Sequence, residues 1–525
     1  MKYPIGIQTF EQIINGGFVY VDKTELVYRL VNNGKVYFLG RPRRFGKSLL
    51  LSTLEAYFQG RKELFKGLAI DALEQEWKQY PVFHLDFNTG NYLNDGTLEA
   101  GIKDKLSDWE KLYGLVNDNP DLAQRFQKIL HAAHEQTGLG AVVLIDEYDK
   151  PILDMDFHVE HLGKTMTLEE KHRNILKSFY ATFKGADADL RFVFLTGVTK
   201  FSQISMFSGF NQPDDISLDD EYEAICGITK EELVKYFSEQ IREMATKLNC
   251  SYEEMIERLQ LKYDGYHFSA RMTEVFNPFS LLNAFKKLRL NSYWFKSGTP
   301  TYLIRLLSHS DENLDELVGR YYSVSQFDDY KADVEKPLPM IYQSGYLTIK
   351  GYDEDTDSFL LDIPNNEVRE GLLTLIANDY LKTKEDSTSW LIDSVHKLKR
   401  GELEAFMEGM TAFLASIPYS VRRKKTEREY ERHFQYTFYL LLRMLSCFTV
   451  FHEKETSKDR ADCVIETPKD VYIFEFKLDG SADAALQQIR DKGYAKEYEA
   501  DSRNVHLIGA NFSSGEGTVN EWKEG

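Results

Sequence analysis

The stretch VYFLGRPRRFGKSLLLSTL, residues 36–54, decides the fold of the N-terminal part of the chain. A short apolar run is followed by a basic loop and by an apolar helical pattern from Lys47 onward, which predicts a strand, a loop and a helix. At such a junction, free backbone N–H groups and the helix dipole favour a bound phosphate, here around Gly46. Lys47 supplies a cation for the β and γ phosphates of a triphosphate, and the Ser48 hydroxyl can bind Mg²⁺. The alternative is a surface turn with a basic cap.

The glycine spacing of this loop differs from the standard phosphate-binding loop, in which four residues separate the two glycines. Five residues separate Gly40 from Gly46. Either Gly40 serves in a loop that is one residue longer, or Arg41 replaces the first glycine and belongs to the nucleotide site.

Two further apolar runs end in polar side chains that suit the same site. The run AVVLIDEYDKP, residues 141–151, ends in Asp146 and Glu147, and ligands of α/β sheets bind at the carboxyl ends of strands. Asp146 would hold Mg²⁺ and Glu147 would orient or deprotonate an attacking water, unless both form an acidic strand cap in solvent. RFVFLTG, residues 191–197, places Thr196 where it could sense a γ-phosphate, although a threonine in a turn explains it equally well.

Short apolar runs alternate with helical stretches throughout residues 1–228. The runs at 36–40, 81–87, 141–145 and 191–197 are typical of buried parallel strands in a layered α/β fold. The sequence therefore predicts an α/β multidomain protein whose first domain, residues 1–228, has the parallel sheet of a P-loop NTPase.

Residues 229–420 have a different pattern, with helical segments followed by GYLTIKGY, an acidic turn and SFLLDIP. A hairpin after a helix is compatible with a winged-helix unit. Its tip would repel a phosphate backbone, so we expect this region to pack on the first domain as a lid or relay and not to touch DNA. The tip carries Asp353, Glu354, Asp355 and Asp357.

Residues 421–525 predict an α-β-β-β-α-β core with a cluster of carboxylates. In the strand VYIFEFKL, a two-residue period puts Glu475 and Lys477 on one face. Asp462 lies thirteen positions before Glu475 and could share a divalent cation with it, and Glu431 in the preceding helix could complete the ligands. Such oxygens suit Mg²⁺ or Mn²⁺, and Lys477 could either activate water or offset the charge of a pentavalent phosphate. Taken alone, the Glu-x-Lys pattern is also explained by an exposed ion pair.

Charge is unevenly distributed along the 525 residues. The net charge of −19 divides into −2 for residues 1–150, −15 for 151–419 and −2 for 420–525. The total argues against a protein that coats nucleic acid with its whole surface. Basic clusters at residues 41–47 and 422–428 could nevertheless bind anionic ligands near both ends of the chain.

Cysteine usage and hydropathy suggest a cytoplasmic protein that does not enter a membrane. The four cysteines form no CxxC pair, which argues against a disulfide framework or a structural zinc site. The longest apolar runs have about five residues, against the roughly 18 to 20 needed to span a bilayer. The N-terminus MKYPIGIQTF has no apolar signal-peptide core. The cysteines are Cys226, Cys250, Cys447 and Cys463.

Several motifs of the first two thirds of the chain resemble the AAA-ATPase-like family of bacterial proteins. They are YVDKTELV at 20–27, RPRRFGKSL at 41–49, LIDEYDKP at 144–151, TGVTKFSQISMFSGFN at 196–211, ICGITKEEL at 225–233, YDGYHF at 263–268, NPFSLL at 277–282 and IYQSGYLTI at 341–349. In that family the arginine-rich loop stands in for the ordinary Walker A motif, so the resemblance favours Arg41 in place of the first glycine. It implies ATP as a bound cofactor.

The C-terminal pattern of Asp462, Glu475 and Lys477 resembles the PD-(D/E)XK nuclease superfamily. The run DVYIFEFKLDGSADAALQQIRDKGY, residues 470–494, is similar to the branch that accompanies AAA-ATPase-like domains. The resemblance implies a metal-dependent nuclease in which these three residues are catalytic.

In that branch the next helix adds a glutamine and a tyrosine near the metal, which would correspond to Gln488 and Tyr494. Two residues that are six positions apart do not share one face of a helix, so one of the two could serve packing alone. Asp459 stands where such families usually have glycine, and it could crowd or recharge the metal site.

The sequence thus favours an ATP-binding and ATP-hydrolysing P-loop protein coupled to a nuclease that acts on DNA. The basic run at 422–428 would guide the strand to the metal, or it is a solvated linker. One rival hypothesis is a nucleotide-switched binding or scaffold protein with a nuclease fold that does not cleave. A weaker one is a small-molecule kinase that uses only the first half. Whether the DNA is single- or double-stranded, and whether the chain forms an oligomer, stays open.

Overall fold

In the computed structural model the chain forms two compact units, Met1–Val368 (unit 1) and Arg369–Gly525 (unit 2). The predicted division into three domains, at residues 228 and 420, stays a prediction. The structure describes residues 1–116, 119–152, 158–161, 163–200, 213–295, 317–328, 337–372, 393–394, 396–416, 463–467, 469–498, 502–513, 515–516 and 518–525.

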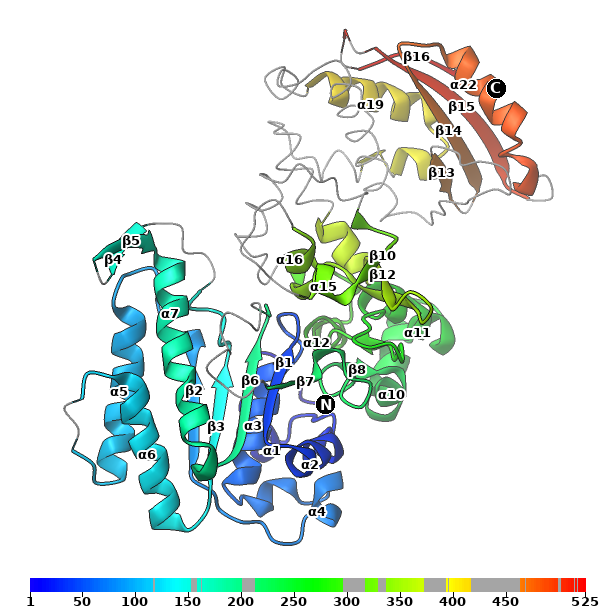
Figure 1. The fold of residues 1–525 in the computed structure, drawn as a ribbon. Coiled ribbons are helices and arrows are strands. Elements are labelled where there is room, and N and C mark those ends of the chain that lie inside the picture. Colours follow the sequence, from blue (N-terminus) through cyan, green and yellow to red (C-terminus); the bar gives the residue numbers. More distant parts are fainter. Residues whose placement is uncertain are drawn as a thin grey trace. The chain divides into compact units, whose positions relative to one another are not determined.

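Unit 1 is built on a parallel five-stranded sheet in the order β2-β3-β6-β1-β7 (Figure 1). Its strands are β1 (Val36–Gly40), β2 (Val82–Asp86), β3 (Ala141–Asp146), β6 (Leu190–Gly197) and β7 (Asp214–Asp215). All six residues of β3 are buried, as expected for a parallel strand covered on both faces. The predicted parallel sheet is confirmed, and its strands end along a common edge.

Helices cover this sheet on both sides of the strand row. Helices α3 and α6 both contact β3, and Figure 1 shows α5, α6 and α7 gathered near β2 and β3. A capping box between Thr167 and Glu170 starts α7. The helices are α1 (Phe10–Asn15), α2 (Thr24–Asn33), α3 (Lys47–Phe58), α4 (Ala69–Leu73), α5 (Thr97–Leu112), α6 (Leu122–Thr137), α7 (Leu168–Tyr180) and α8 (Thr182–Gly185). Smaller elements are β4 (His158–His161), β5 (Lys164–Thr167) and the 3₁₀ turns η1 (Lys62–Phe65), η2 (Phe87–Thr89), η3 (Asp187–Asp189) and η4 (Ile216–Leu218).

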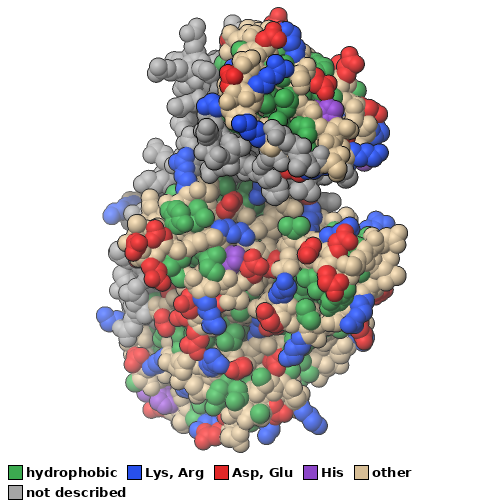
Figure 2. Space-filling view, turned by 90° about the vertical axis from the view of Figure 1, so that its right-hand side faces the viewer, with side chains coloured by type: hydrophobic (Ala, Val, Ile, Leu, Met, Phe, Trp, Pro, Cys, Tyr) green, Lys and Arg blue, Asp and Glu red, His purple; other side chains and the backbone are tan. Residues whose placement is uncertain are grey.

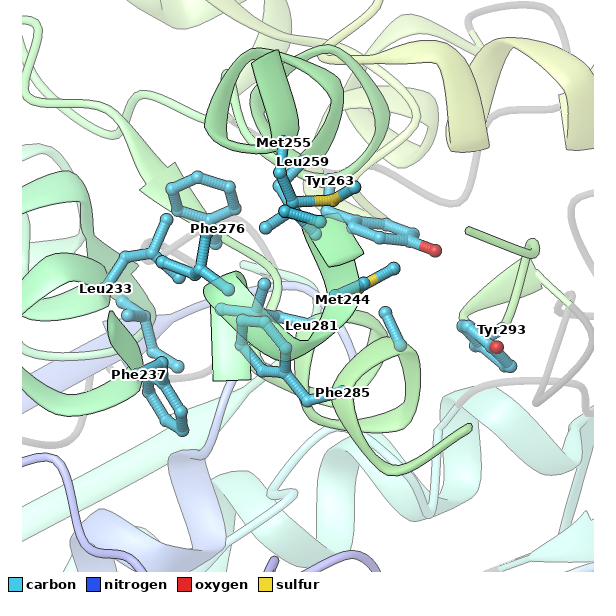
Figure 3. Packing of buried hydrophobic residues seen from close by; sticks show 14 residues of the cluster. Leu233, Phe237, Met244, Met255, Leu259, Tyr263, Phe276, Leu281, Phe285 and Tyr293 are labelled. Atoms are coloured by element: carbon cyan, nitrogen blue, oxygen red, sulfur yellow. The ribbon is translucent and has the colours of Figure 1, made fainter. Parts of the chain in front are cut away.

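A helical subdomain with its own apolar core follows the sheet within unit 1. It contains α10 (Lys230–Lys247), α11 (Tyr252–Tyr263), α12 (Pro278–Lys287) and the short strands β8 (Ile228–Thr229) and β9 (Val275–Phe276). Phe237 and Phe285, both labelled in Figure 3, stack on each other. Their ring centroids are 5.2 Å apart. Each fully buried side chain of this size contributes roughly 1.5–3 kcal/mol. This core fixes α12 in place, and α12 reaches the site described below.

An antiparallel three-stranded sheet completes unit 1 in the order β10-β12-β11. Its elements are β10 (Arg320–Ser323), α15 (Val324–Phe327), α16 (Leu338–Gln343), β11 (Thr348–Asp353) and β12 (Ser358–Asp362). The predicted hairpin is present as β11 and β12; Asp353 ends β11, and the other acidic residues of the tip lie in the turn between the two strands. The winged-helix interpretation of this sheet remains a hypothesis.

Unit 2 contains a mixed sheet in the order β13-β14-β15-β16. Its elements are α19 (Leu403–Ser416), β13 (Cys463–Glu466), β14 (Asp470–Leu478), α22 (Ala482–Lys492), the turn η6 (Lys496–Tyr498), β15 (Asn504–Ser513) and β16 (Thr518–Glu524). β14 and β15 are parallel, whereas β13 and β16 are antiparallel to their neighbours. The predicted order of strand, helix and strand around β14, α22 and β15 is present. The predicted first helix and first strand of this core lie outside the described residues.

Charged side chains of both signs are interspersed over the face of unit 1 drawn in Figure 2. Among its described residues, this face therefore has no broad basic area of the kind that coats nucleic acid. None of the helices in the described ranges combines the length and the apolar character required to cross a membrane.

Candidate nucleotide and nuclease sites

The loop of residues 41–46, called the RPRRFG loop below, joins β1 to α3 at the carboxyl edge of the parallel sheet. Gly46 has φ +99°, and a Cβ added there would meet no described atom within 4 Å. Arg44 also has positive φ, at 68°. No described side chain caps the N-terminus of α3, and its first turn contains no acidic residue. The helix dipole and the first N–H groups of α3 are therefore available to an anion.

Lys47 begins α3 with its ammonium folded back onto the RPRRFG loop. Its Nζ donates to the carbonyl oxygens of Arg41 at 2.9 Å and Pro42 at 3.2 Å, and the residue is 4% exposed. An anion bound over the loop would compete with these two carbonyls for the ammonium.

A cleft of about 590 Å³ lies over the loop, and a nucleotide-sized ligand fits such a volume. Its wall combines charged side chains of both signs with apolar side chains. The polar part is formed by Arg43, Arg44, Gly46, Lys47, Ser48, Asp86, Asn88, Thr89, Glu147 and Lys150, and the rest by Pro4, Ile5, Gly6, Ile7, Gln8, Leu49, Pro278, Phe279, Leu282 and Trp294.

Of the residues predicted at the strand ends, Glu147 lines the cleft, whereas Asp146 and Thr196 are buried. Glu147, at φ +50°, is partly exposed and lines the cleft. Asp146 is 3% exposed, and its Oδ1 accepts a 2.7 Å hydrogen bond from the Thr196 hydroxyl. Thr196 is fully buried and does not line the cleft, so in this structure it orients Asp146.

Two acidic residues of this edge were not predicted. Asp86 ends β2 directly opposite Asp146 and lines the cleft. Asp149 is buried, and its Oδ2 accepts from Thr199 N and Oγ1, both at 2.7 Å, and from Val198 N at 3.0 Å. Burial, and then the nearby Glu147, raise the pKa of Asp149. The second aspartate of LIDEYDKP was the available signal for Asp149.

Arg41 points away from the cleft. Its guanidinium donates to the carbonyls of Gly40, Ser217, Tyr222 and Glu223, and it lies 4.1 Å from the Phe268 ring centroid. Burial lowers its pKa. The arrangement makes the Arg41 side chain an internal brace of the loop, while the loop's two other arginines line the cleft. A direct contact of Arg41 with a nucleotide stays a prediction.

In unit 2, Glu475, Lys477 and Gln488 form one polar cluster. Glu475 is 2% exposed; its Oε1 accepts from Gln488 Nε2 and lies 3.8 Å from Lys477 Nζ. Lys477 in turn donates to Gln488 Oε1. Gly509 pairs with Glu475 in the sheet, and a Cβ there would collide with the Ala482 carbonyl of α22. The bare glycine lets α22 lie close enough to bring Gln488 to the strand.

The structure describes only some of the other predicted nuclease residues. Tyr494 is buried in the apolar core of unit 2, with Val464 and Ile489. Asp462, Glu431, Asp459 and the run 422–428 lie outside the described residues. Within the described ranges, no three His, Cys, Asp or Glu side chains are grouped to hold a metal ion. The metal ligands therefore stay a prediction.

Comparison with known proteins assigns two parts of the chain. A family model described as Predicted AAA-ATPase matches residues 4–207, and a model of the PD-(D/E)XK nuclease superfamily matches residues 429–522. The chain belongs to the AAA-ATPase-like family, with a C-terminal PD-(D/E)XK nuclease superfamily domain. Similarity to a known protein also extends over nearly the whole chain. The chain is 34% identical over 523 residues to the "Uncharacterized protein in vnfD 5'region" of Azotobacter chroococcum mcd 1, covering 98% of this chain and 96% of that protein.

For this AAA-ATPase-like chain, a glycine outside the matched ATPase segment helps to shape the RPRRFG loop. Gly345 has φ +87°, and a Cβ added there would lie 2.7 Å from the Pro42 Cβ. We expect Gly345→Ala to displace the loop and to lower the free energy of unfolding by about 1–3 kcal/mol. Hydrogen exchange should become faster in residues 41–46.

Gly319→Ala is the matched control, because Gly319 also has positive φ, at 71°, but no described atom lies within 4 Å of its added Cβ. It should lower the free energy of unfolding through the strained backbone alone, without changing hydrogen exchange in the RPRRFG loop. Equal exchange in the loop for both variants would show that the contact with Pro42 does not position it.

Proposed function

We propose that the protein binds and hydrolyses ATP in the unit 1 cleft and that this activity is coupled to a metal-dependent nuclease in unit 2 that hydrolyses DNA phosphodiesters. The observation that carries the proposal is the position of Lys47 and Glu147 on one cleft, over an uncapped helix N-terminus. The apolar side chains of the cleft wall suit a base, and its basic side chains suit phosphates.

In the ATPase part, each polar group has a distinct task. Gly46 and the first N–H groups of α3 would hold the β-phosphate, and Lys47 would exchange its bonds to Arg41 and Pro42 for phosphate oxygens. The oxygens of Ser48 and Asp146 fit Mg²⁺, which would neutralise charge on the phosphates. Glu147 would orient the attacking water or accept its proton.

In the nuclease part, Glu475 and Lys477 are the described members of the reacting group. Asp462 directly precedes Cys463, and Cys463 pairs with Phe474. The oxygens of Asp462 and Glu475, with Glu431, fit Mg²⁺ or Mn²⁺, which would polarise the phosphodiester. Lys477 would stabilise negative charge on the phosphate, and Gln488 would keep Glu475 and Lys477 in register.

The test is cleavage of labelled single- and double-stranded DNA by the full-length protein with Mg²⁺, with and without ATP. We expect Mg²⁺-dependent cleavage whose rate changes on the order of tenfold when ATP is added, because one chain holds both sites. Removal of Mg²⁺ by a chelator should abolish both cleavage and ATP turnover. ATP turnover without cleavage of either DNA would overturn the nuclease part and support a nucleotide-switched scaffold. We also propose a cytoplasmic location.

A further inference from the structure

Trp294 connects the cleft to a part of the chain far from the RPRRFG loop in sequence. It lines the cleft and is 6% exposed, and its indole Nε1 donates a 3.0 Å hydrogen bond to the Arg43 carbonyl. The two residues are 251 positions apart. The indole also packs on the Tyr346 ring, with centroids 5.2 Å apart. The indole nitrogen is the only polar atom of a tryptophan side chain, and here it donates to a carbonyl of the RPRRFG loop. Trp294 therefore holds the loop in place from a distant part of the chain.

A buried carboxylate holds the backbone of Trp294. Glu367 is 1% exposed, and its Oε1 accepts from the backbone nitrogens of Tyr293 and Trp294, the second at 2.8 Å. Burial is the main reason that the pKa of Glu367 is raised. A carboxylate is costly to bury without hydrogen bonds, so these two N–H groups and Glu367 are mutually dependent.

Glu367 is also placed where unit 1 ends. Val368 is the last residue of unit 1, and its backbone nitrogen donates to Asn365 Oδ1 at 3.1 Å. Asn365 Nδ2 in turn donates to the Asp264 carbonyl at 2.8 Å. The segment that leads from unit 1 into unit 2 is thus bonded on one side to the helical subdomain and, through Trp294, on the other to the RPRRFG loop.

We propose that Trp294 and Glu367 are positioning residues for the RPRRFG loop and that together they transmit the occupancy of the nucleotide cleft to the end of unit 1. The inference rests on the proposed binding of ATP in the cleft. A phosphate that takes over the Lys47 ammonium releases the carbonyls of Arg41 and Pro42, and the loop must readjust. Arg43 follows these two residues directly, so the readjustment acts on the bond to Trp294.

The first experiment compares wild type with Trp294→Phe, which keeps an aromatic ring against Tyr346 and removes only the indole donor. Steady-state ATP hydrolysis should show a KM raised about five- to tenfold with kcat changed less than about twofold, because ground-state holding of the loop is lost. ATP should change the tryptophan fluorescence of wild type but not of this variant. Trp109→Phe is the matched control, because Trp109 packs on Phe83 and Phe126 and does not line the cleft.

Glu367 is tested by a pair of substitutions. Glu367→Gln keeps a side-chain oxygen that can accept both N–H groups, so its KM for ATP should stay near the wild-type value. Glu367→Ala removes the acceptor, and its KM should rise as in Trp294→Phe. Unchanged KM and fluorescence response in Trp294→Phe would overturn the positioning role while leaving the proposed function intact. A wild type that does not bind ATP would overturn the proposed function, and the inference with it.

Discussion

Lys47→Ala is expected to weaken ATP binding by at least about 100-fold, since two charge-assisted bonds to phosphate at roughly 1.5–3 kcal/mol each are lost. Lys47 begins α3 and lines the cleft. Isothermal titration with ATP and Mg²⁺ measures the effect directly. ATP turnover should fall with binding, because the remaining groups of the cleft cannot supply the missing charge.

The fold of the variant needs a separate measurement, because Lys47 also bonds the Arg41 and Pro42 carbonyls. Both carbonyls belong to a loop beside an open cleft, so water can replace the ammonium, and we expect a Tm within a few degrees of wild type. Lys66→Ala is the matched control, an exposed lysine in the same unit that does not line the cleft. Wild-type affinity in Lys47→Ala, with normal folding, would contradict the proposed nucleotide site.

The sequence predicts β1, β2, β3 and β6 of unit 1 well because each is a short apolar run between polar boundaries, whereas β7 consists of Asp214–Asp215 and has no apolar signal. β1, β3 and β6 begin and end within about one residue of the predicted runs. The final strand β16 was missed for the opposite reason. It is the edge strand of its sheet, with one buried residue, Val519, among seven, so its sequence resembles that of a loop. Its pairing with β15 defines it as a strand.

The site is predicted less completely, because the spacing of residues along the sequence does not show which strands are neighbours in the sheet. Asp86 faces Asp146 only because β2 and β3 are neighbours in the sheet. The basic cluster at 41–47 looks uniform in sequence, yet Arg41 is buried on backbone carbonyls while Arg43 and Arg44 line the cleft. No motif in the sequence links Trp294 to the RPRRFG loop. Local motifs thus predict candidate reacting groups, whereas tertiary packing decides which residues hold them in place.

Glu475→Gln is expected to lower DNA cleavage by about 10³-fold or more while leaving ATP binding at the wild-type level. The substitution keeps the shape of a side chain that is 2% exposed and removes the negative charge that would bind the metal. The new amide still has an oxygen to accept the hydrogen bond from Gln488 Nε2, so unit 2 should keep its fold. The residual activity is measured with labelled DNA at several Mg²⁺ and Mn²⁺ concentrations, because a weakened site should require more metal.

Glu404→Gln provides the matched control, since Glu404 is an exposed glutamate on α19 of the same unit and the charge change is identical. Its cleavage rate should equal that of wild type. Lys477→Ala should reduce the rate at every metal concentration, because the ammonium acts on the phosphate and not as a metal ligand. If Glu475→Gln cleaves at the wild-type rate while a chelator still stops the reaction, the metal must be bound by other residues. The described cluster around Gln488 would then serve only the packing of α22 on the sheet.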